Sequence, residues 1–160
     1  MSNRIYSMSA IHEILYQQED TEQVSFYDYV EVLCLHFTTL SNTDGPPLFN
    51  IEVGDKYFNL ETCTPLGIIL TELLMNSLKY ARKDNEQLVV SIGLRAEKDG
   101  YLLSYKDNGF GFPDGHLSSR EGGLGTYLLK SMSRQLNGTF SSRNNDGAES
   151  VVFFKEKNTK

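Results

Sequence analysis

A long apolar stretch between residues 65 and 81 constrains the fold more than any other feature of this sequence. The stretch reads PLGIILTELLMNSLKYA. Its length and its lack of strict alternation predict a helix, which Pro65 is expected to open. The helix is apolar on nearly every side, so other elements must cover it on more than one side. A chain with such a helix needs a layered fold built around it.

The segments around this helix predict an α+β fold. Helical spacing predicts helices over residues 9–17 and 26–37, and Ser25 is the expected N-cap of the second. The dipeptide Gly54-Asp55 predicts a hairpin. We therefore expect a two-layer sandwich, in which helices cover one face of a mixed, mostly antiparallel sheet. The remaining expected elements are strands at residues 48–53, 56–60, 87–96, 101–106, 139–142 and 150–154, and a helix at 124–136.

A cluster of turn-forming residues at positions 42–47, NTDGPP, divides the chain. It separates an N-terminal helical arm, residues 1–45, from a domain that spans residues 46–160. A chain of 160 residues is long enough to bury a core without disulfides or structural metals.

The charge of the chain excludes some partners. Its formal net charge is -6, whereas nucleic acids and anionic membranes require clustered Lys and Arg side chains. A nucleic acid is therefore not an expected partner, but a small anion such as a nucleotide remains compatible with this charge.

Cys34 and Cys63 are expected to act as small buried hydrophobes in a reducing compartment. The N-terminus has no signal-peptide pattern, so we expect a cytoplasmic chain, whose parent protein could be attached to a membrane.

Three polar side chains interrupt the apolar helix. Glu72, Asn76 and Lys79 follow one another at intervals of four and three residues, so they project from one face. On the helix alone, this pattern is more typical of a solvated stripe with a Glu-Lys pair. Two glycine-rich segments later in the chain favour a binding role instead.

The first glycine-rich segment begins with Asp107 at the end of an expected strand. Its pattern is Asp107-x-Gly109-x-Gly111, in which the glycines let the backbone approach a flat ring and adopt positive φ angles. Taken alone, the pattern is also compatible with a simple turn. A dinucleotide-binding fingerprint would require glycine at the position of Asp114, and the chain has no P-loop motif.

The second glycine-rich segment leads directly into the helix expected near residue 124. It contains Gly123, Leu124, Gly125 and Thr126. The free N–H groups and the dipole at a helix N-terminus attract anions, and small residues let phosphate oxygens reach those donors. A flexible hinge is the alternative interpretation of this segment.

Together, the three elements resemble the nucleotide pocket shared by gyrase, the ninety-kilodalton chaperones, histidine kinases and MutL. The resemblance spans roughly residues 66–154. The polar helix residues, followed by Tyr80 and Ala81, match the asparagine box of that superfamily, and the two glycine segments match its glycine boxes. The resemblance implies a Bergerat-type ATP-binding fold with ATP and Mg²⁺ as ligands.

The resemblance also implies a role for each site residue. Asn76 would supply its amide oxygen to Mg²⁺, and Asp107 would bind the adenine amine. The segment from Gly123 to Gly125 would donate hydrogen bonds to the phosphates. Lys79 would neutralise phosphate charge, and Tyr80 would flank the ribose or the base.

The N-terminal arm narrows the resemblance to one family. Residues 4–16 (RIYSMSAIHEILY) and 26–29 (FYDY) resemble the second dimerisation helix and linker of bacterial sensor histidine kinases. Such kinases transfer the γ-phosphoryl group of ATP to a histidine of their dimerisation domain, and a response regulator receives it afterwards. The resemblance implies a dimeric full-length parent, an acceptor histidine outside this chain, and Glu72 as the residue that orients or deprotonates that acceptor. His12 is interpreted as a structural helix residue.

One departure from the family pattern lies near the C-terminus. The family usually carries Gly-Thr where this chain has Gly147-Ala148. The missing hydroxyl predicts a weaker contact to adenine, or a contact that Asp107 makes through water. Two alternative functions remain open on the sequence: an anti-sigma-factor-like serine kinase, and a non-enzymatic module that nucleotide binding switches.

Overall fold

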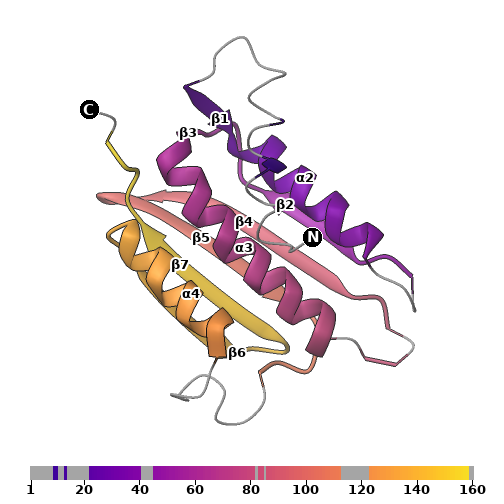
Figure 1. Cartoon of the computed structure of the whole chain (residues 1–160). Coiled ribbons are helices and arrows are strands. Elements are labelled where there is room, and N and C mark those ends of the chain that lie inside the picture. Colours follow the sequence, from indigo (N-terminus) through magenta and orange to yellow (C-terminus); the bar gives the residue numbers. More distant parts are fainter. Residues whose placement is uncertain are drawn as a thin grey trace.

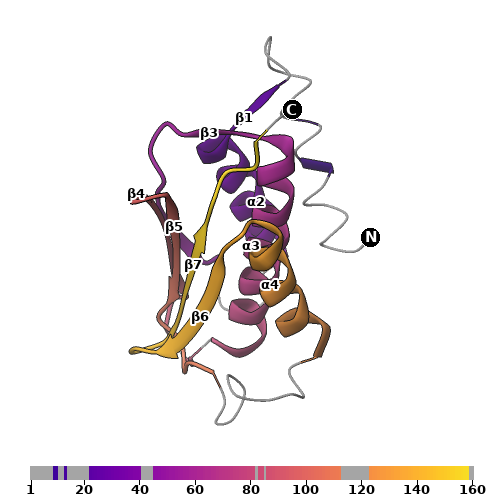
Figure 2. The ribbon, with the colours of Figure 1, turned by 90° about the vertical axis from the view of Figure 1, so that its left-hand side faces the viewer.

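The described part of the chain forms one five-stranded sheet with helices on one face (Figure 1). The computed structural model describes residues 9–10, 13, 22–40, 45–81, 83–84, 86–112 and 123–158. Seen along the sheet, the described helices all lie on the same side of it (Figure 2). The elements are β1 Gln23–Ser25, α2 Phe26–Thr39, β2 Leu48–Glu52, β3 Tyr57–Asn59, α3 Leu60–Tyr80, β4 Val89–Glu97, β5 Gly100–Asp107, α4 Gly123–Gln135, β6 Thr139–Asn144 and β7 Ala148–Phe154.

The five-stranded sheet has the order β2-β4-β5-β7-β6. Only the β2–β4 pair is parallel among these neighbours, and the other three pairs are antiparallel. Side chains alternate between the two faces, so Ile92, Leu103 and Val152 point into the core below the helices. The predicted α+β sandwich with a mixed, mostly antiparallel sheet is confirmed.

Helix α3 crosses the middle of the sheet and is the most deeply buried helix (Figure 1). It starts at Leu60, so the prediction that Pro65 opens it is wrong. Asn59 caps the helix instead, because its side chain accepts a hydrogen bond of 3.0 Å from the N–H of Thr62. Pro65 lies inside the helix, where it removes one backbone hydrogen bond. Asn59 therefore marks the start of the helix about one and a half turns before Pro65.

The hairpin predicted around Gly54-Asp55 is also wrong. β2 pairs with β4 in the large sheet, whereas β3 pairs with β1 in a separate two-stranded sheet. A two-residue type I′ hairpin needs two consecutive positive φ angles, but only Gly54 has one, at 66°. In this arrangement, Phe49 and Ile51 of β2 are partly buried and pack against the common core.

The N-terminal part of the chain contributes to the same core as the sheet. Ser25 caps α2 as predicted, accepting a hydrogen bond of 3.3 Å from the N–H of Asp28. The hydroxyl end of the buried Tyr29 side chain packs on Gly67 of α3, where a methyl group would overlap it. Most of the helix predicted over residues 9–17 lies outside the described residues, although residues 9, 10 and 13 are helical. The division of the chain at residue 45 stays a prediction.

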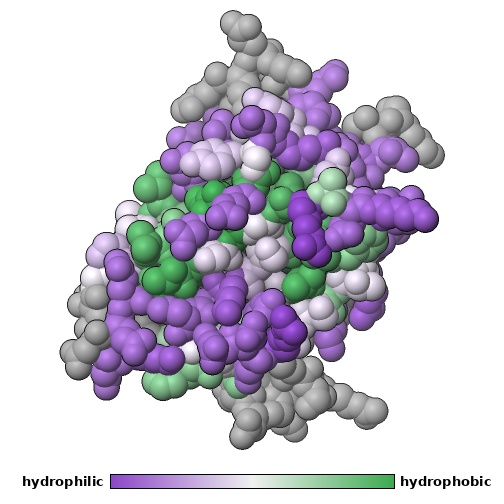
Figure 3. All heavy atoms as spheres, turned by 180° about the vertical axis from the view of Figure 1, so that it is seen from behind, coloured by the Kyte–Doolittle hydropathy of each residue, from purple (hydrophilic) through white to green (hydrophobic). Residues whose placement is uncertain are grey.

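The other face of the sheet has a mixed surface. Figure 3 shows hydrophobic residues in patches among hydrophilic ones on this side.

Cys34 and Cys63 are free and buried in the core, and burial raises the pKa of each thiol to about 12. Both thiols therefore stay protonated and act as small hydrophobes, as the sequence predicts. None of the described helices is both long and apolar enough to span a membrane.

Candidate functional site

Two adjoining cavities lie between α3, α4 and the sheet. We call the first the inner pocket: it reaches Ser77, Tyr105, Asp107 and Ser150 and has a volume of about 20 Å³. The second, the outer pocket, reaches Thr126, Lys130 and Ser142 and has a volume of about 330 Å³. Asn76 and Phe112 line both pockets, so the two pockets adjoin at these residues.

The carboxylate of Asp107 is the centre of the inner pocket. Asp107 is the last residue of β5, as predicted, and only 3% of its surface is exposed. Its Oδ1 accepts hydrogen bonds from the N–H groups of Gly109 at 3.0 Å and Ala148 at 3.1 Å. Its Oδ2 accepts a hydrogen bond of 2.7 Å from the hydroxyl of Ser77. Two carboxylate oxygens offer about four acceptor positions, so one position on Oδ2 is left for an external donor such as an exocyclic amine.

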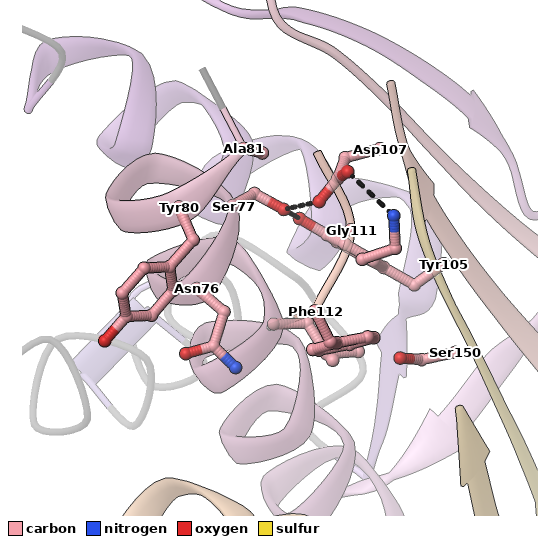
Figure 4. Close-up of a pocket in the computed structure, with 11 residues that line it drawn as sticks. Asn76, Ser77, Tyr80, Ala81, Tyr105, Asp107, Gly111, Phe112 and Ser150 are labelled. Carbon is pink, nitrogen blue, oxygen red and sulfur yellow. Dashed lines mark hydrogen bonds between the residues drawn. The ribbon is translucent and has the colours of Figure 1, made fainter. Parts of the chain in front are cut away.

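A buried tyrosine fixes the direction of this network. The hydroxyls of Tyr105 and Ser77 lie 2.7 Å apart, and Figure 4 shows both beside Asp107. Ser77 gives its only proton to the carboxylate, so Tyr105 must donate to Ser77. Burial raises the pKa of Tyr105 well above its ordinary value, which keeps the phenol protonated and able to donate. The network therefore presents Asp107 to the pocket only as an acceptor.

The first glycine segment turns sharply against the end of α3. Gly109 is buried, and a Cβ atom there would overlap the backbone of Ala81. Gly111 has a φ angle of 84°, which favours glycine. The side chain of Asn144 on β6 holds the next residue from both sides, because it accepts from the N–H of Phe112 at 2.8 Å and donates to its carbonyl at 3.2 Å. The ring of Phe112 thereby lies within the pocket (Figure 4).

The second glycine segment lies against the carboxylate of Glu72. Helix α4 begins at Gly123, as the anion-site prediction requires. Glu72 is only 3% exposed, and a Cβ atom on Gly125 would lie 3.0 Å from its Oε2. The glycine thus lets a buried carboxylate of α3 approach the first turn of α4. This contact brings together two of the predicted sequence elements.

The remaining predicted site residues are spread around the outer pocket. Thr126 lines it, and the side chain of Leu124 is largely exposed beside it on the first turn of α4. Tyr80 lines the rim of the inner pocket with 53% of its surface exposed. Lys79 is exposed and lines neither pocket, whereas Lys130 of α4 lines the outer pocket. The structure therefore provides a cation that the sequence patterns did not indicate.

Other contributors were also missed by the sequence patterns. Ser77, Tyr105, Phe112 and Ser150 all line the inner pocket. Ser77 lies one residue after Asn76, and Tyr105 two residues before Asp107, so the second could have been found from strand alternation. The position of Ala148 also has a function that does not depend on its side chain, because its backbone N–H binds Asp107.

Comparison with known proteins identifies the class of this site. A family model described as histidine kinase-, DNA gyrase B- and HSP90-like ATPase matches residues 63–158, and a histidine kinase model matches residues 1–41. The sensor histidine kinase PdtaS of Mycobacterium tuberculosis is 26% identical over 144 residues, which cover 88% of this chain. The chain spans only 28% of the length of that relative.

Solved structures share the fold. The histidine kinase domain of the Erythrobacter litoralis EL346 blue-light activated histidine kinase has a TM-score of 0.82 at 16% identity, covering 96% of this chain and 73% of that one. The Acinetobacter baumannii histidine kinase AdeS has a TM-score of 0.62 at 15% identity, covering 96% of this chain and 77% of that one.

The chain belongs to the family of histidine kinase-, DNA gyrase B- and HSP90-like ATPases. Residues 1–41 also match a histidine kinase model, and the similar protein PdtaS is a sensor histidine kinase. The predicted family and ATP as its ligand are thereby confirmed, whereas the role of each site residue stays a prediction.

Proposed function

We propose that this chain is the catalytic ATP-binding part of a sensor histidine kinase, which transfers the γ-phosphoryl group of ATP to a histidine. The observation that carries the proposal is the placement of two buried carboxylates along one site. Asp107 lies at the floor of the inner pocket, and Glu72 lies beside the start of α4, which borders the outer pocket. The carboxylate of Asp107 can accept a hydrogen bond from the amine of a base. The carboxylate of Glu72 can accept a proton from a group that reacts near the phosphates.

In this proposal, adenine binds at the inner pocket and the phosphates bind in the outer pocket. The inner pocket has a volume of only about 20 Å³ and contains the ring of Phe112, so this ring must move aside for adenine to enter. Asp107 accepts a hydrogen bond from the 6-amino group through the open position on Oδ2. The ring of Tyr80 flanks the ribose or the base. N–H groups between Gly123 and Gly125 donate to phosphate oxygens, because the first N–H groups of a helix have no acceptor within the helix. Lys130, which lines the outer pocket, and the predicted Lys79 would offset phosphate charge.

The residues of the site fit a magnesium ion that the nucleotide brings with it. Asn76 lines both pockets, so its amide oxygen lies where base and phosphates would meet. Among the described residues, no group of three His, Cys, Asp or Glu side chains could hold a metal ion by itself. Mg²⁺ is commonly held by one or two protein oxygens together with substrate phosphates and water, which suits a single asparagine.

Glu72 would act on the acceptor rather than on ATP. It lies one helical turn before Asn76 on the same face of α3, buried beside the first turn of α4, and the family resemblance gives it the role of meeting the acceptor imidazole. Glu72 would orient that imidazole or take its proton as the phosphoryl group arrives. Most of the rate acceleration would come from positioning and from charge stabilisation of the phosphates.

The partners follow from the same reaction. We propose an acceptor-histidine dimerisation domain in the same parent protein, a dimer of that parent, and a response regulator that receives the phosphoryl group. The matched residues 1–41 would then be the end of the dimerisation and linker region, ahead of the ATPase domain. Because ATP and response regulators are cytoplasmic, the proposed site lies in the cytoplasm.

The proposal is tested by phosphoryl transfer between separate chains. We expect the chain alone, incubated with γ-labelled ATP, to acquire no label, because its histidines lie outside an acceptor motif. Adding the parent's dimerisation domain should produce acid-labile label on that domain. Acid-stable label on serine would favour the serine-kinase alternative, and ATP binding without any transfer would favour the nucleotide-switched module. Label on the chain that disappears in His12→Ala would make His12 the acceptor.

Replacement of Asn76 by alanine should remove the magnesium dependence of ATP binding. The reason is that the variant loses the only side-chain oxygen that we assign to the ion, while the nucleotide keeps its contacts in the inner pocket. Calorimetry with and without Mg²⁺ measures the effect, and circular dichroism checks the fold. Asn50→Ala, a change on exposed β2, is the matched control and should behave like the wild type. An unchanged magnesium dependence in Asn76→Ala would show that another group holds the ion.

A further inference from the structure

The inner pocket contains a buried hydroxyl to which the proposed function gives no role. Ser150 of β7 is only 1% exposed to solvent, yet it lines the pocket. Its side chain points toward Phe112 from the sheet side of the cavity (Figure 4). Asp107 lines the same pocket from the neighbouring strand β5. A base held by Asp107 would therefore have Ser150 beside it.

A second serine leaves one proton of this pair available to a ligand. The hydroxyls of Ser150 and Ser142 lie 2.8 Å apart across the β6–β7 pair. One hydrogen bond between two hydroxyls uses one of their two protons. When Ser142 donates, the proton of Ser150 is free to point into the inner pocket. Ser142 borders the outer pocket, so it supports Ser150 from the side away from Asp107.

Ser150 lies on the same face of β7 as Ala148, the position at which the chain lacks the hydroxyl of the family pattern. Residues two apart on a strand point to the same face, roughly 6.5 Å from each other. Ala148 and Ser150 both line the inner pocket, which agrees with this spacing. β7 therefore presents a hydroxyl to the inner pocket two residues after Ala148, while the backbone of Ala148 donates to Asp107.

We propose that Ser150 is a second base-recognition residue, whose hydroxyl donates to ring nitrogen N1 or N7 of adenine. Both nitrogens are acceptors and flank the 6-amino group that Asp107 would bind. Asp107 would then accept a hydrogen bond from the 6-amino group, and Ser150 would donate one to the neighbouring ring nitrogen. This inference rests on the proposed function, because it takes the inner pocket as the adenine site.

The test compares ADP with 1-deaza-ADP and 7-deaza-ADP, each of which lacks one of the two nitrogens. Calorimetry would measure the affinity of all three for the full chain and for Ser150→Ala. We expect Ser150→Ala to bind ADP about three- to tenfold more weakly, the range for one uncharged hydrogen bond. One of the deaza compounds should bind the wild type more weakly by a similar factor. The affinity of that compound should be the same for Ser150→Ala as for the wild type, because the compound lacks the nitrogen that Ser150 would contact.

Controls separate this inference from the proposed function. Ser104→Ala changes a serine on the opposite face of the sheet and should leave all three affinities unchanged. Ser150→Cys keeps the size with a much weaker donor and replaces the alanine variant if that variant does not fold. A wild type that binds no adenine nucleotide would overturn the proposed function itself. A wild type that binds all three equally, or losses that simply add in the variant, would overturn only the role of Ser150.

Discussion

Replacing Glu72 by glutamine is expected to lower phosphoryl transfer to the acceptor domain by about 10²- to 10⁴-fold while ATP affinity changes little. Glutamine keeps the size and the hydrogen-bonding capacity of the side chain but cannot take a proton. Because Glu72 is buried against Gly125, a shape-preserving change is required to leave α4 in place. The measurement is the rate of label transfer from γ-labelled ATP to the separate dimerisation domain, with ATP affinity measured in parallel.

A matched control exists on the same helix. Glu61 lies in the first turn of α3, exposed and away from both pockets, so Glu61→Gln should transfer label at the wild-type rate. Loss of ATP binding in Glu72→Gln would show that the carboxylate supports the start of α4 rather than the acceptor. Transfer at the wild-type rate would remove Glu72 from the reaction altogether.

Replacing Asp107 by asparagine should weaken ATP binding by about 1 to 3 kcal/mol and reduce the preference for ATP over GTP. An amide nitrogen at the Oδ1 position would face two backbone N–H donors, and at the Oδ2 position it would force the Ser77 hydroxyl to accept instead of donate. The open acceptor on Oδ2 would also be lost if the nitrogen takes that place. In the wild type, guanine would present its O6 acceptor to the carboxylate and should bind poorly.

Calorimetry with ATP and GTP tests this prediction. Asp99→Asn is a suitable control, because Asp99 is exposed in the β4–β5 turn with a φ angle of 70°, which asparagine also tolerates. Equal affinity of the wild type for ATP and GTP, unchanged in Asp107→Asn, would contradict adenine recognition by this carboxylate.

Features set by local sequence were predicted well. The predicted strands of the large sheet are present, and the glycine segments placed the turn after Asp107 and a helix start near residue 124, which the structure has at Gly123. These features depend on residues within one or two turns of each other. The cap at Ser25 belongs to the same class, because its partner lies three residues away.

Features set by distant partners were not predicted. The hairpin predicted at Gly54-Asp55 is absent because β2 pairs with β4 and β3 pairs with β1, partners that are distant in the sequence. The network around Asp107 joins Ser77 and Tyr105, whose hydroxyls meet only after α3 packs on the sheet. The position of Lys130 on the outer pocket likewise depends on how α4 lies against β6. Sequence patterns identify single elements, but they do not show which faces of distant elements meet.

The three donors to Asp107 come from α3, from the loop after β5 and from β7. This acceptor site therefore exists only when all three segments have folded together, and the unfolded chain offers no equivalent. A ligand that binds there is thermodynamically linked to folding. At a free concentration 100 times its dissociation constant, such a ligand raises the free energy of unfolding by about 2.7 kcal/mol. Nucleotide would then act as a folding ligand for the domain, so that the amount of folded domain follows the supply of nucleotide.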